Sequence, residues 1–240
     1  MIKLENTEVF GWKAAIRGMR NPMNSWNKSD SVFLDSDNVA VEDRIHIGEY
    51  TIGEDDLKLM NNLIKSGDDH GKVARYLDVY VDITAPLYWW KEFRTYRKGR
   101  KFMDDGDEFF LDPDEFELHI ETNSCSTMHK IHTKEFSIDD FSCEHLTPAS
   151  MELLKSIIVN LNLYRDGYNT CPMKDHRKMY WWQMIQLLPS SYNQKRTVKL
   201  NYQVLKNMYH ARKNHKLDEW IDFCEWIKTL PYAKELICGE

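Results

Sequence analysis

Residues 188–212 read LPSSYNQKRTVKLNYQVLKNMYHAR, and the interpretation of the fold starts from this stretch. Proline lacks a backbone N–H and cannot continue a helix, so Pro189 predicts the end of a preceding one. Ser190 or Ser191 can cap the next helix, which we expect over residues 192–213.

One face of this expected helix mixes apolar and polar side chains. At a rotation of about 100° per residue, this face carries Val198, Asn201, Leu205, Met208 and Arg212. An unpaired buried amide or charge costs several kcal/mol. Asn201 and Arg212 must therefore meet protein acceptors, a partner subunit or a ligand, and the pattern leaves these alternatives open.

Apolar spacing and capping residues predict further helices outside this stretch. They are expected near residues 12–19 and over 54–65, 87–93, 148–167, 174–188 and 217–230. Residues 76–84 alternate polar and apolar side chains, which is typical of a half-buried strand. A further strand is expected to open the chain.

Residues 98–122 join a basic cluster to an acidic, aromatic segment without a clean period, so we interpret them as a surface insertion. No internal repeat is visible. The sequence therefore predicts one α+β domain over residues 1–240, with a small sheet in the N-terminal half and a mostly helical C-terminal half.

Composition narrows the classes of function. The 240 residues contain 32 Lys+Arg and 38 Asp+Glu, a formal net charge of −6. Such a balance argues against binding a nucleic-acid polymer, which needs a broad positive surface, but allows a basic pocket for one small phosphate. No segment reaches the roughly 20 apolar residues that span a bilayer. We expect a cytoplasmic protein that does not cross a membrane, with reduced cysteines.

The order and spacing of these segments resemble the flavin-dependent thymidylate synthase family, ThyX, over nearly the whole chain. The residues LP at 188–189 and the segment that begins at Asn201 are similar to the family's LP and N-x-R-S-x-x-N-F-x-x-x-R. This resemblance implies that Asn201, Gln203 and Asn207 contact FAD and that Arg212 contacts the substrate nucleotide. Gln203 stands where the family has an arginine.

Two other segments carry the resemblance. Residues 93–97, FRTYR, and 123–129, NSCSTMH, are similar to the two halves of the signature R-H-R-x-x-S-x-N-E-x-S-x-R-Y. The match implies that Arg97 and Asn123 contact FAD and that Ser126 contacts the nucleotide. His70 stands where a family histidine would also contact FAD.

The chain departs from the family at positions that carry charge. Met128 and Ile185 stand where the family has nucleotide-binding arginines. A thioether cannot stabilise the negative charge that develops when uracil is activated, and loss of one such donor typically slows catalysis by two to three orders of magnitude.

The resemblance implies a ThyX-like α+β fold, a small twisted sheet and a homotetramer that shares FAD sites between subunits. In the family, reduced FAD passes a hydride and a methylene-folate supplies the carbon, with NADPH as reductant.

Two hypotheses follow from these residues. The first is a divergent flavoprotein that transfers one carbon to a dUMP-like pyrimidine nucleotide. The second is a binding protein that keeps the nucleotide pocket without turnover and sequesters or senses a nucleotide. Retention of Asn201 and Asn207 favours the first hypothesis, whereas Met128 and Ile185 favour the second.

A metal site and a phosphate-binding run are further candidates. Cysteine and histidine ligands of the right kind for zinc occur at Cys125, His129, His132, Cys143 and His145, but their spacing matches no common zinc finger, so we predict no metal. The basic run from Arg94 to Lys101 either meets a phosphate or forms a solvated helix end.

Overall fold

The computed structural model describes residues 2–33, 50–67, 69–97 and 120–239. Its main sheet has four strands in the order β1 (Lys3–Phe10), β4 (Asp78–Pro86), β6 (Asn193–Asn201) and β5 (Glu121–Ser124). A smaller sheet pairs β2 (Val32–Phe33) antiparallel with β3 (Tyr50–Thr51). The α+β fold class predicted from the sequence is confirmed.

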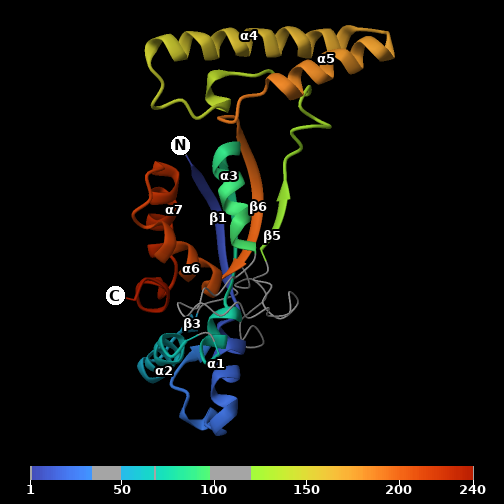
Figure 1. The fold of residues 1–240 in the computed structure, drawn as a ribbon. Helices are drawn as coiled ribbons and strands as arrows, with labels where there is room; N and C mark the ends of the chain where they lie inside the picture. Colours follow the sequence, from blue (N-terminus) through green and yellow to red (C-terminus); the bar gives the residue numbers. More distant parts are fainter. Residues whose placement is uncertain (1, 34–49, 68, 98–119, 240) are drawn as a thin grey trace, which may run out of the picture. The chain divides into compact units, whose positions relative to one another are not determined.

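Helices and short helical turns connect these strands (Figure 1). The α-helices are α1 (Trp12–Arg20), α2 (Glu54–Lys65), α3 (Leu87–Phe93), α4 (Pro148–Thr170), α5 (Lys174–Leu187), α6 (Tyr202–Arg212) and α7 (Asp218–Lys228). The shorter turns are η1 (Asn21–Met23), η2 (Trp26–Lys28), η5 (Gly71–Arg75), η6 (Arg94–Arg97), η7 (Ile138–Asp140) and η8 (Lys234–Cys238). Within the described ranges, no helix is both long and apolar enough to cross a lipid bilayer.

The chain divides into two compact units. Unit 1 comprises Met1–Asn6, Val81–Val198 and Lys216–Phe223, and unit 2 comprises Thr7–Tyr80, Lys199–His215 and Cys224–Glu240. Strands β1, β4 and β6 each contribute one end to each unit. The prediction of a single domain over residues 1–240 stays a prediction.

The long helix expected over residues 192–213 is wrong in its first half. Residues Asn193–Asn201 form strand β6, and only Tyr202–Arg212 are helical. Even-numbered residues of β6 are buried and odd-numbered ones face outward up to Lys199, a period of two rather than 3.6. The helical face that was expected to join Val198 and Asn201 to Arg212 therefore does not exist.

Strand β6 is antiparallel to β4. The backbone N–H of Leu87 donates to the carbonyl of Tyr192 at 3.0 Å, and that of Tyr202 donates to the carbonyl of Leu77 at 3.1 Å. The later residue of the β4 segment bonds the earlier residue of the β6 segment, and the earlier one bonds the later. This order requires antiparallel pairing.

Other local predictions are confirmed, with small shifts. Helix α4 begins at Pro148, as the sequence predicts, and the side chain of Thr147 caps it by accepting a hydrogen bond from the backbone N–H of Ser150. Most of the expected insertion at 98–122, namely residues 98–119, lies outside the residues that the structure describes. Its last residues are corrected, because Ile120 is buried and β5 begins at Glu121.

Unit 1 holds an aromatic cluster and a helical pair. Trp89 and Phe93 of α3 pack against Trp220 and Phe223, and Trp90 packs against Trp89 and Phe93. Helices α4 and α5 lie side by side (Figure 1). They enclose a second cluster with the preceding loops, made of Ile131, Phe136, Phe141, Leu154, Ile158, Leu161 and Met184.

A half-buried tyrosine of unit 1 pairs with a carboxylate. The hydroxyl of Tyr88 donates to the buried Glu219. Burial and the Glu219 carboxylate raise the pKa of Tyr88, so this hydroxyl stays protonated and acts as a donor.

Unit 2 contains a buried ion pair. Arg20 Nη2 lies 2.6 Å from Asp56 Oδ1, and both side chains are almost fully buried. The hydroxyls of Ser29 and Ser31 each donate to Asp56 Oδ2 at 2.6 Å. Burial alone would raise the pKa of Asp56, but the hydrogen bonds from Ser29, Ser31 and Arg20 outweigh it and lower the pKa.

Replacing Asp56 by Asn is expected to lower the free energy of unfolding by about 3–5 kcal/mol, because it leaves a buried guanidinium without its counter-charge. Urea denaturation at pH 7 measures the change. Asp55→Asn alters an exposed neighbour on the same helix and is the matched control, with an expected change within about 0.5 kcal/mol.

The same pair has a predicted pH dependence. Because the folded-state pKa of Asp56 is lowered, its contribution is complete above about pH 4, the unfolded value, and is lost as the pH falls through the folded pKa. The difference in stability between wild type and Asp56→Asn must therefore narrow in acid. A difference that stays constant or widens there contradicts this account.

Candidate functional site

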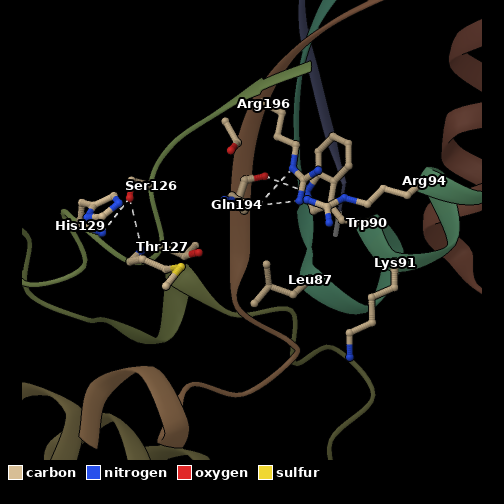
Figure 2. A pocket seen from close by; sticks show the side chains of 11 residues that line it. Leu87, Trp90, Lys91, Arg94, Ser126, Thr127, His129, Gln194 and Arg196 are labelled. Atoms are coloured by element: carbon tan, nitrogen blue, oxygen red, sulfur yellow. Dashed lines mark hydrogen bonds between the residues drawn. The ribbon is translucent and has the colours of Figure 1, made fainter. Parts of the chain in front are cut away.

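A pocket of about 440 Å³ lies within unit 1. It opens between α3, strand β6 and the loop that follows β5 (Figure 2). Its lining residues are Leu87, Trp90, Lys91, Arg94, Ser124, Ser126, Thr127, Met128, His129, Gln194 and Arg196. This volume falls in the range of about 300–1,000 Å³ that is typical of small-molecule sites.

One wall of the pocket is a hydrogen-bonded group of three side chains. Arg196 donates from Nε and Nη2 to Gln194 Oε1, at 3.1 and 2.8 Å. Its guanidinium lies over the indole ring of Trp90, with 4.2 Å between Cζ and the ring centroid. Trp90 Nε1 donates to the backbone carbonyl of Gln194 at 3.0 Å. The wall is therefore rigid and carries a positive charge.

Gln194 also joins this wall to the loop after β5. Its Nε2 donates to the carbonyl of Cys125 at 2.6 Å, and the N–H of Cys125 donates to the carbonyl of Lys195 at 3.0 Å. The next residue, Ser126, accepts with its hydroxyl oxygen from the N–H groups of Met128 and His129, at 3.3 and 2.8 Å. The oxygen is occupied as an acceptor, which leaves the Ser126 hydroxyl to act as a donor.

The described side chains that line the pocket carry a net positive charge. Lys91, Arg94 and Arg196 line it, and no acidic residue is among its described lining. Figure 2 shows Arg94 extending toward the Trp90–Arg196 pair. Leu87, Trp90 and Met128 supply apolar surface. An anion with an attached flat, partly apolar group fits this combination of charge and surface.

Three of the residues predicted from the sequence belong to unit 1. Ser126 lines the pocket. Asn123 lies in β5 and is exposed, one residue before the lining residue Ser124. Arg97 is the last residue of η6, and its side chain lies outside the part of the structure that is described.

The other five predicted residues belong to unit 2. Asn201 ends β6, and its Oδ1 accepts from the N–H of Val204 at 3.0 Å, which caps α6. Gln203 is buried, and its Nε2 donates to Asn207 Oδ1 at 3.3 Å. Asn207 is exposed, as is His70, which lies directly before η5.

Arg212 is half-buried at the end of α6. Burial raises the pKa of the Cys224 thiol to about 11, and the charge of Arg212 is among the interactions that oppose this rise. The capping bond shows that Asn201 meets a donor of its own chain, and the charge of Arg212 acts on a thiol of its own chain. Of the alternatives that the sequence left open, contact with the same chain therefore accounts for the polarity of Asn201 without a ligand.

Sequence reasoning missed Gln194 and Arg196 because it assigned their segment to a helix. In β6 the inward positions are Gln194, Arg196, Val198 and Leu200, so polar residues fill half of the buried face. The usual alternation of apolar and polar residues is hidden. The alternation of Lys195, Thr197 and Lys199 on the outer face was the signal that remained.

The residues of the zinc hypothesis have separate roles. His145 Nε2 lies 2.8 Å from Asp218 Oδ2, and the ring of His132 lies 4.3 Å from that of Tyr168. Across the described ranges, no three His, Cys, Asp or Glu side chains form a group that would hold a metal ion.

Comparison of the structure with solved proteins identifies its fold. ThyX from Helicobacter pylori with FAD and dUMP is similar at 14% identity and a TM-score of 0.59, with 99% of this chain and 97% of that one covered. The UMP/dUMP methylase PolB from Streptomyces cacaoi, bound with 5-Br dUMP, is similar at 12% identity and a TM-score of 0.54, with 100% and 95% covered. No model of a protein family and no curated protein matches the sequence. The fold is that of ThyX, as the sequence resemblance implied.

Gln194→Ala is expected to lower the free energy of unfolding by about 1–3 kcal/mol, because it removes the acceptor of a buried guanidinium and the donor to Cys125. Chemical denaturation measures this change. Gln183→Ala, at an exposed position of α5, is the control and should leave stability unchanged. Equal effects of the two substitutions would mean that the wall does not depend on Gln194.

Proposed function

We propose that this chain is a divergent ThyX-like protein that binds a dUMP-like pyrimidine nucleotide in the unit 1 pocket. The observation that carries the proposal is a pocket lined by Lys91, Arg94 and Arg196 and by no described acidic residue. It is supported by the ThyX fold, because two similar structures contain dUMP or a dUMP analogue as their ligand.

The chemistry of the lining suits the two ends of a nucleotide. Guanidinium and ammonium groups bind phosphate oxygens through charge-assisted hydrogen bonds. The indole of Trp90 and the side chains of Leu87 and Met128 offer apolar surface to a base. The hydroxyl of Ser126, an acceptor for two N–H groups, directs its own hydrogen to a ligand oxygen.

FAD is the proposed cofactor of a reductive one-carbon transfer to this nucleotide. When bound, FAD would supply the hydride, with a methylene-folate as carbon donor and NADPH as reductant. The predicted FAD residues fit in part. His70, Asn123 and Asn207 are each exposed, so each is accessible to a ligand, and they and Arg97 stay the proposed FAD contacts. Asn201 and Gln203 already bond within α6 and its cap, so they fit less well.

A nucleotide-binding protein without turnover is the second candidate. Met128 lines the pocket with a thioether, and Ile185 packs against the core cluster between α4 and α5. At both positions the ThyX family has a cation, and no uncharged side chain replaces its effect on a developing negative charge. These two residues favour binding over catalysis.

Self-association is proposed as well. The α4 helix exposes Leu153, Val159 and Leu163, each more than 60% accessible. Large exposed apolar side chains of this kind occur at interaction surfaces. It supports the homotetramer that the resemblance implies.

A purified sample tests the ligand and the cofactor together. Saturating dUMP at about 100 times its Kd is expected to stabilise the fold by about 2.7 kcal/mol, seen as a higher Tm. Uridine, which lacks the phosphate, is the matched control and should stabilise much less. No stabilisation by dUMP would exclude the nucleotide proposal.

The visible spectrum of the same sample separates the two candidate functions. Bound FAD gives a yellow protein whose colour is released on denaturation, and Asn207→Ala should reduce the bound fraction. A colourless protein that FAD does not stabilise, but dUMP does, is the expected result for the binding protein without turnover.

Light scattering tests the assembly. Leu163→Glu places a charge on the exposed face of α4 and is expected to shift the particle toward a smaller species, because burying that charge costs several kcal/mol. Met173→Glu, exposed directly before α5, is the control. A wild-type monomer at micromolar concentration would contradict the tetramer.

A further inference from the structure

Arg196 is a buried arginine whose charge is directed into the pocket. It belongs to the inward face of β6 and is only 5% accessible, although it lines the cavity. The ThyX-like motif begins five residues later, at Asn201, so the resemblance assigns no role to this position.

The guanidinium of Arg196 is held in one orientation by its neighbours. Two donors, Nε and Nη2, bond the same oxygen of Gln194, and the indole of Trp90 lies beneath the charge at 4.2 Å. Gln194 is in turn fixed to Cys125 through Nε2. Because the side chain is already ordered, a ligand that binds it does not bear the entropy of ordering a long, flexible cation.

Like charges surround the same space. Lys91 and Arg94 line the pocket from α3 and η6, opposite Arg196 on β6. Figure 2 shows Arg94, Arg196 and Trp90 among the side chains that line this pocket. Cations that share a cavity of low dielectric repel one another, and an anion between them converts this repulsion into attraction.

We propose that Arg196 is the principal anion-binding residue of the pocket and supplies the positive charge that Met128 and Ile185 do not. The ligand class is a phosphate monoester, whose oxygens match the planar fork of a guanidinium. The inference that Arg196 binds the phosphate group of a nucleotide rests on the proposed function. The inference that Arg196 binds a phosphate anion does not depend on it.

Calorimetric titration of the full-length protein with dUMP, and with inorganic phosphate at constant ionic strength, tests the proposal. Arg196→Met is expected to weaken dUMP binding about 10- to 100-fold, the effect of losing a charge-assisted hydrogen bond. Lys195→Met is the matched control. Lys195 is the preceding residue of the same strand and faces the other way, toward Asp82 at 3.0 Å. Its substitution should change the affinity less than about 2-fold.

Arg196→Lys provides the second variant in case the methionine variant does not fold, as judged by circular dichroism. It keeps the charge but loses the planar fork and the stacking on Trp90, so we expect a loss of about 5- to 20-fold. Affinities of both Arg196 variants within about 2-fold of the wild type would overturn the proposal. A similar loss in Lys195→Met would also overturn it, because general charge rather than position would then decide binding.

The two probes separate this inference from the proposed function. Binding of phosphate that depends on Arg196, without any binding of dUMP, supports the anion site and overturns the nucleotide proposal. Binding of dUMP with an affinity that the Arg196 variants do not change supports the nucleotide proposal and overturns the anion site at Arg196. A wild-type protein that binds neither overturns both.

Discussion

The bonding of Gln194 is the constraint on which the candidate site depends. Its side-chain oxygen accepts from Arg196, its side-chain nitrogen donates to Cys125, and its backbone carbonyl accepts from Trp90. One buried amide thereby connects α3, β6 and the loop after β5, the three segments that form the pocket. A buried amide that satisfies its donors and its acceptor in this way is both stabilising and geometrically specific.

This arrangement explains why a cation can be kept inside unit 1. A buried guanidinium is costly unless hydrogen bonds and a favourable electrostatic surface compensate for lost hydration. Gln194 provides the first and the face of the Trp90 indole provides the second. Gln194 and Trp90 are themselves uncharged, so they orient the guanidinium without adding a charge of their own.

The distribution of charge separates this chain from the family that its fold resembles. The sequence resemblance sets Met128 and Ile185 at positions where the family has arginines, and the structure puts these two residues in different surroundings, the first at the pocket and the second against a core cluster. The cations that line the pocket belong to α3, η6 and β6. Under the proposed function, binding and catalysis are therefore separate questions for this protein.

The sequence by itself determined the α+β class, most helix boundaries and strand β4, because caps, prolines and periodic apolar spacing act within a few residues. The order of motifs was also sufficient to suggest the ThyX fold. It predicted that Ser126 contacts a nucleotide; the structure shows that Ser126 lines the pocket, and its role there stays a prediction. Tertiary structure alone decided that residues 193–201 are a strand, because half of the buried face of β6 is polar and its partners, Trp90 and Cys125, are distant in the sequence. It likewise decided that Asn201 caps a helix and that Arg196 belongs to the pocket, because the role of a polar side chain depends on the groups that it contacts in the folded chain.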